Sequence, residues 1–192
     1  GAIGIGLLFS KLQLEGPIIK GRTSFNVSGR RSYWDFVAKP FMSDDSKFGY
    51  YFYDLNAKIN HRFNDRSRLF ISLYNGKDKM DSEFQDPGED YSTKDKADLQ
   101  WGNFLSAVKW NYQISPKLFS NTTLAYTHYN FNVKSRYLDK SVSQNYDNDY
   151  YSDYSSGIKD LTFNADFDYN PLPNHHIKFG GGYLKHQFKP EV

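Results

Sequence analysis

The stretch FGYYFYDLNAKINHRF, residues 48–63, alternates apolar and polar side chains at every second position. Its apolar positions are Tyr51, Tyr53, Leu55, Ala57 and Ile59, and its polar positions are Asp54, Asn56, Lys58, Asn60 and Arg62. Strict alternation is typical of a β-strand whose two sides meet different surroundings, and no helical period fits it. The stretch therefore predicts one long strand with an apolar face and a polar face.

The same alternation recurs on both sides of this strand and fills most of the chain. The strands it predicts are residues 2–14, 23–36, 48–63, 68–74, 99–114, 118–133, 157–169 and 175–188. The facing of residues 118–133 stays open, because Thr and Tyr occur in both of its registers. The pattern predicts an all-β fold without helices, an antiparallel up-and-down meander of about eight long strands in four hairpins.

The predicted connections alternate in length along the chain. The short turns are residues 15–22, 64–67, 115–117 and 170–174, and the long loops are residues 37–47, 75–98 and 134–156. Short turns at one end and long loops at the other are typical of outer-membrane barrels. Several strands also exceed the usual globular length of about 5 or 6 residues. We therefore expect residues 1–192 to form part of a transmembrane β-barrel, with a soluble β-sandwich as the alternative.

The composition excludes several other classes of protein. The chain has no cysteine, which excludes a disulfide framework and a thiolate metal site. A net charge of +2, with no basic cluster among aromatic residues, gives no footprint for nucleic acid. No run of about 18 apolar residues is present, so a transmembrane helix is not expected. The aromatic content of 18% suits a surface that borders both apolar material and water.

Two sets of residues are candidates for functional contacts. The polar strand faces should line a wet or plug-filled interior, and they contribute Arg30, Asp54, Lys58, Arg62, Asn164 and Asp166. The tract NYDNDYYSDY, residues 145–154, lies in a predicted extracellular loop, where Tyr rings can stack on a ligand and acidic side chains can bind its hydroxyls. Its candidate ligand-binding residues are Tyr146, Asp149, Tyr150, Tyr151 and Tyr154. The alternative is that this tract is only a solvated surface loop.

Neither catalysis nor a cofactor is indicated by the sequence. The five histidines lack the spacing of a zinc site, and His175 and His176 are adjacent, so they point to opposite faces of an extended chain. No nucleophile elbow, phosphate-binding loop or dinucleotide motif occurs. We therefore expect no enzymatic activity, no cofactor and no metal.

One stretch resembles a known family. LQLEGPIIKGRTSFNVSGRRSYWD, residues 12–35, resembles the early barrel region of TonB-dependent outer-membrane receptors, especially the Bacteroidetes type. The matching positions are Glu15-Gly16-Pro17-Ile18, Lys20-Gly21-Arg22, Thr23-Ser24-Phe25, Ser28, Arg30 or Arg31, Ser32-Tyr33 and Asp35. Residues 53–63, 101–131 and 175–190 look like later parts of the same family. The resemblance implies a fragment of a receptor barrel that lacks the plug domain, the TonB box and the remaining strands.

The resemblance also implies a location and partners. The intact receptor would lie in the outer membrane of a Gram-negative bacterium and import a nutrient, such as a glycan, a peptide, a siderophore or cobalamin. Its partners would be outer-membrane lipid, its own plug and remaining strands, and the TonB complex. A complete eight-stranded outer-membrane barrel is an alternative, as is a soluble ligand-binding barrel or sandwich. Because strands 2–14 and 175–188 would have unpaired edges, we expect the fragment to self-associate or to close on itself.

Overall fold

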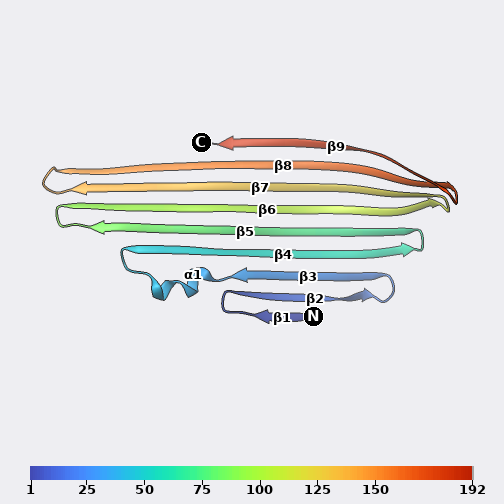
Figure 1. Ribbon diagram of the computed structural model, residues 1–192, viewed down its shortest axis with the longest axis horizontal. Helices are drawn as coiled ribbons and strands as arrows, with labels where there is room; N and C mark the ends of the chain where they lie inside the picture. The colour runs from blue at the N-terminus through green and yellow to red at the C-terminus, as the bar shows by residue number, and fades with distance from the viewer. Residues whose placement is uncertain (192) are drawn as a thin grey trace.

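The computed structural model describes residues 1–191, so the last residue of the predicted domain, Val192, lies outside the described residues. Within them the chain forms one antiparallel sheet of nine strands, in which each strand pairs with the next in sequence order. The strands are β1 (Ala2–Ile5), β2 (Phe9–Ile19), β3 (Thr23–Ser32), β4 (Ser46–Asn64), β5 (Ser67–Pro87), β6 (Tyr91–Ser115), β7 (Leu118–Ser141), β8 (Tyr146–Leu172) and β9 (His175–Glu191). Figure 1 shows them side by side in a single layer. The predicted all-β antiparallel meander is confirmed.

The two ends of the sheet differ. At one end, which we call the base, the chain turns at residues 20–22, 65–66, 116–117 and 173–174. At the other end, which we call the tip, β5 to β8 project well beyond β2 and β3, as Figure 1 shows. The turns at the tip are residues 88–90 and 142–145.

Two of the predicted long loops are wrong. Residues 75–98 and 134–156 belong to β5, β6, β7 and β8 except for the short turns at the tip. Their backbones form a continuous ladder, with Asp81 opposite Asp98 and Arg136 opposite Tyr151. The polar side chains of these segments suggested loops. A strand needs apolar side chains only on a face that is buried, and neither face is buried here.

The first hairpin also differs from the prediction. The expected single strand 2–14 is divided into β1 and β2 by a tight turn, in which the Gly6 N–H donates to the Phe9 carbonyl at 2.9 Å. The expected turn at 15–22 begins only after Ile19. Pro17 therefore lies inside β2, next to a register shift and beyond the part of β2 that pairs with β1. Its missing N–H costs no ladder hydrogen bond on that open side.

The expectation of a chain without helices is wrong in one connection. Residues 33–45 contain a helical turn, α1 (Trp34–Val37), and a 3-10 helix, η1 (Lys39–Phe41), with Pro40 in its first turn. Proline suits this place because the first N–H groups of a helix have no intrahelical partner. Within residues 1–191, neither α1 nor η1 has the length and apolar composition that a membrane-spanning helix needs.

A single layer leaves the chain without an interior. Among the described residues no hydrophobic side chain is buried, and the buried residues are four serines and three glycines: Ser32, Ser67, Ser120, Ser141, Gly49, Gly76 and Gly102. Directly opposed residues of neighbouring strands share one face, and successive residues alternate between faces. The register therefore assigns side chains to two faces, which we name the Val108 face and the Lys109 face after adjacent residues of β6.

The row through Val108 shows how the sheet is organised. It is apolar in all seven strands from β3 to β9, and its members are Phe25, Ile59, Ile71, Val108, Leu124, Phe163 and Tyr183. The adjacent row on the Lys109 face is Ser24, Asn60, Phe70, Lys109, Thr123, Asn164 and Gly182. The register thus settles the facing of β7, since Leu124 lies on the apolar side and Thr123 on the polar side.

The apolar side chains of the Val108 face form a band in the half of the sheet near the base. On β6 this apolar band runs from Phe104 to Ile114, and on β8 it runs from Leu161 to Tyr169. Its large members are exposed, for example Leu124 at 49% and Phe163 at 44%. Small hydroxyl groups interrupt it, for example at Ser106, Ser120 and Thr122, and no charged side chain of β6 or β8 lies in it.

Candidate functional site

The predicted interior residues do share one face. Arg30, Asp54, Lys58, Arg62, Asn164 and Asp166 all lie on the Lys109 face. The Arg30 guanidinium donates to the Asp54 carboxylate through Nε at 2.7 Å and lies over the Phe52 ring at 5.0 Å. Near the base the sheet therefore has one apolar face and one polar face, as the alternation predicted.

Toward the tip the Val108 face becomes charged. Beyond the apolar band, seven ion pairs join side chains of this face, which we call the charged block. They are Lys47–Glu83, Lys94–Glu83, Lys96–Glu83, Lys79–Asp98, Lys134–Asp153, Arg136–Asp149 and Lys140–Asp147. The ammonium groups of Lys94 and Lys96 both lie 2.9 Å from the Glu83 carboxylate, and these hydrogen bonds lower the pKa of Glu83 to about 2. An apolar surrounding would not tolerate such a block.

The Lys109 face changes in the opposite sense. Beyond the level of Arg30 it carries a group of large aromatic and aliphatic side chains, which we call the aromatic wall. Its members are Tyr50, Phe52, Met80, Phe84, Leu99, Trp101, Phe131, Val133, Tyr137, Tyr150 and Tyr154. Phe131 contacts Tyr154 edge-on, with 6.5 Å between the ring centroids. Tyr137 stacks on Tyr150, with 6.2 Å between the ring centroids and an interplanar angle of 27°. Toward the tip the Val108 face is therefore charged, whereas the Lys109 face carries aromatic and aliphatic side chains among polar ones.

The predicted ligand-binding loop is not a loop, and its residues do not form one site. All five lie in β8, so they alternate between the faces. Tyr146, Tyr150 and Tyr154 lie on the Lys109 face, whereas Asp149 and Tyr151 lie on the Val108 face. The Asp149 carboxylate accepts two hydrogen bonds from Arg136, which lowers the pKa of Asp149. Strand alternation separates these residues by the thickness of the sheet.

Residues that the sequence pattern did not identify lie beside the three tyrosines. Asp95 and Tyr137 share a row with Tyr150, and Ser82, Ala97, Ser135 and Ser152 form the next row toward the base. A hydrogen bond with Tyr91, together with burial and the charges of Asp139 and Asp95, raises the pKa of Tyr137 to about 12. No local motif marks these residues, because the long-range register alone brings them together.

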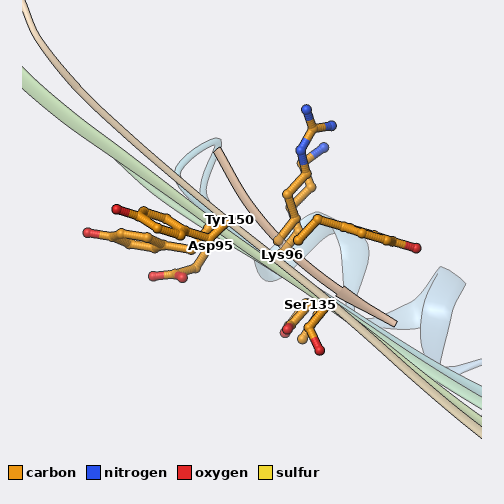
Figure 2. Close-up of a pocket in the computed structure, with 10 residues that line it drawn as sticks. Asp95, Lys96, Ser135 and Tyr150 are labelled. Atoms are coloured by element: carbon orange, nitrogen blue, oxygen red, sulfur yellow. The ribbon is translucent and has the colours of Figure 1, made fainter. Parts of the chain in front are cut away.

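A hollow of about 330 Å³ lies at the tip of the sheet, where residues of β5 to β8 line it (Figure 2). Figure 2 views the strands nearly edge-on, with Asp95, Ser135 and Tyr150 on one side and Lys96 on the other. Arg136 and Tyr151 also line the hollow. They belong to the Val108 face, and they reach the hollow because the sheet is only one layer thick. The described residues contain no group of three His, Cys, Asp or Glu side chains that could hold a metal ion.

The chain has a structural likeness to a known protein. No family model and no curated protein matches the chain. Among solved structures it is similar to the crystal structure of the ferric citrate transporter FecA in the unliganded form, with 11% sequence identity and a TM-score of 0.48. The likeness covers 95% of this chain and 32% of that chain, so the chain spans about a third of the length of that transporter.

Proposed function

We propose that the chain is part of the wall of an outer-membrane β-barrel, with its Val108 face toward lipid and its Lys109 face toward the lumen. The observation that carries the proposal is the apolar band, which crosses seven strands on one face and stops at the charged block. In this arrangement the tip projects beyond the membrane. In the same proposal six polar side chains of the Lys109 face point into the lumen, namely Arg30, Asp54, Lys58, Arg62, Asn164 and Asp166.

The height of the apolar band, measured along the strands, supports contact of the band with a membrane rather than with a protein partner. On β6 it extends from Phe104 to Ile114, which at about 3.4 Å per residue is roughly 34 Å along the strand. A strand tilt of about 45° reduces this to roughly 24 Å across the bilayer. Outer-membrane barrels present an apolar band of about 25 Å to lipid. The apolar band therefore has the height expected of a lipid-facing barrel surface.

The alternatives explain less of the structure. A soluble sandwich needs a second layer to cover the apolar band, and within residues 1–191 nothing covers it. A complete eight-stranded barrel needs eight strands and closure, whereas the described chain has nine strands in an open order. Single-chain bacterial barrels usually have even strand numbers. A wall segment of a larger barrel requires neither a second layer nor closure within this chain.

The transporter class rests on the resemblance of residues 12–35 to TonB-dependent receptors. In the proposed receptor the polar Lys109 face would meet a plug domain, and a nutrient would enter from the tip. Energy for import would come from the inner-membrane proton gradient through the TonB complex. The Bacteroidetes type and the outer membrane as location are part of this proposal.

The proposal is tested by fractionating cells that produce the intact protein and measuring nutrient uptake with and without a protonophore. We expect the protein in the outer-membrane fraction, extracted only by detergent. Uptake should stop when the proton gradient collapses, while surface binding of the nutrient should remain. Recovery in the soluble fraction, or uptake that is indifferent to the protonophore, would contradict the proposal.

A further inference from the structure

A groove crosses the Lys109 face of the tip. In β5 to β8 a row of small side chains lies between two rows of larger ones, and opposed pairing places each row at one level. The row nearer the tip is Phe84, Asp95, Tyr137 and Tyr150, the middle row is Ser82, Ala97, Ser135 and Ser152, and the row nearer the base is Met80, Leu99, Val133 and Tyr154. With strands about 4.8 Å apart, the middle row is roughly 14 Å long. The groove is part of the hollow drawn in Figure 2.

The chemistry of the groove suits a ligand with apolar faces and hydroxyl groups. Tyr137 and Tyr150 stack on each other and present ring surface, and Tyr150 is 60% exposed. The serine hydroxyls of the middle row both donate and accept hydrogen bonds, and the Asp95 carboxylate accepts them. Sugar rings offer C–H faces to aromatic rings and hydroxyl groups to such partners.

Charge further restricts the ligand. In the tip portions of β5 to β8 all basic side chains lie on the Val108 face, namely Lys77, Lys79, Lys94, Lys96, Lys134, Arg136 and Lys140. The Lys109 face of the same segments carries only acidic charges, from Asp78, Asp86, Asp95 and Asp139. An anionic ligand in the groove would lie beside the Asp95 carboxylate, with no cationic side chain on the same face of these segments, so its binding would be opposed by like charge.

We propose that this groove binds an uncharged oligosaccharide, with Tyr150 and Tyr137 stacking on a sugar ring and Asp95 accepting hydrogen bonds from its hydroxyls. The inference deepens the proposed function and rests on it, since the Lys109 face is the lumen side only in that account. It also replaces the five-residue loop site by residues that lie on one face.

A glycan array carrying neutral and acidic oligosaccharides tests the groove, with the intact protein in detergent as the probe. We expect binding only to uncharged glycans. Tyr150→Ala should weaken that binding at least about tenfold, because it removes a stacking surface. The matched control is Tyr51→Ala, since Tyr51 lies on the Val108 face of β4 and does not line the hollow. This variant should bind like the unchanged protein.

A second variant separates loss of binding from loss of folding. Ser135→Leu fills the middle row without removing an aromatic ring, so it should block binding while the circular dichroism of the sheet is retained. Binding restricted to acidic glycans, no glycan binding, or equal effects of Tyr150→Ala and Tyr51→Ala would overturn the inference. Outer-membrane location and gradient-driven uptake would survive that result, so failure of the groove is distinct from failure of the proposed function.

Discussion

Glu83 shows how single charges organise the tip. Its carboxylate is held by Lys94 and Lys96 at 2.9 Å and by Lys47 at 3.6 Å, from the strands on both sides of β5. One acidic side chain thus ties three strands together on the Val108 face. The pairs are partly exposed, so salt screens them and each is worth little alone. Their number gives the projecting strands polar contacts in place of apolar burial.

The pKa of Glu83 leads to a prediction for acid stability. The folded-state value of about 2 lies below the ordinary value of 4.5, so the charged carboxylate is favoured in the folded chain. Its stabilising contribution is therefore complete above about pH 4.5 and is lost as the pH falls from there toward about 2. Denaturant unfolding measured across this range should show a pH dependence that Glu83→Gln removes in part. An identical pH dependence in the variant would contradict the assignment.

At the level of the strand, the register decides which side chains would face lipid in the proposed barrel. Leu124 and Ala125 are neighbours in β7, yet Leu124 lies in the apolar band and Ala125 lies opposite Ala107 on the Lys109 face. A charge at the lipid-facing position near the bilayer centre costs about 2 to 4 kcal/mol, whereas a charge toward a wet lumen costs much less.

We therefore expect Leu124→Arg to reduce the free energy of unfolding by about 2 to 4 kcal/mol in lipid vesicles. Ala125→Arg is the matched control, because it adds the same side chain one residue away and should have a small effect. Urea titration of both variants in vesicles measures the difference. Equal destabilisation by the two arginines, or a larger effect at Ala125, would show that the facing of β7 is wrong.

The strands of the base were predictable from local alternation, while the tip was not. Residues 48–63 alternate clearly because one face is apolar there, and the structure keeps that assignment. In residues 75–98 both faces carry polar or charged side chains, so alternation gives no signal and the segment reads as a loop. The pairing that makes it a strand lies between residues far apart, such as Lys96 and Arg136. Because the sequence likewise predicts a loop at residues 134–156, it assigns Asp149 and Tyr151 to one site with Tyr150, although strand alternation places them on the other face.

At the scale of the whole molecule, the sheet does not close on itself. β1 and β9 lie at opposite edges in Figure 1, and within the described residues each pairs on one side only. The expectation that the chain closes on itself is therefore wrong for a single copy. Self-association stays a prediction, because unpaired edges and the exposed apolar band both favour it.

Sedimentation of the isolated chain in detergent checks this prediction. We expect species larger than one chain, since pairing between edges of separate copies satisfies backbone groups that a monomer leaves open. A single monomeric species over a wide range of protein concentration would show that the edges are protected in another way.

In the proposed barrel the Val108 face meets lipid and the Lys109 face meets water. The chain has no cysteine, so single cysteines placed one at a time along residues 104–114 of β6 can each carry a nitroxide label. In vesicles we predict that labels at even positions, including Val108, collide mainly with dissolved oxygen, and that labels at odd positions, including Lys109, collide mainly with a water-soluble nickel complex. Further labels toward the tip should lose the preference for oxygen by Asp98, where the charged block begins on β6. Equal access to the nickel complex at even and odd positions, or lipid access at the odd ones, would contradict the account.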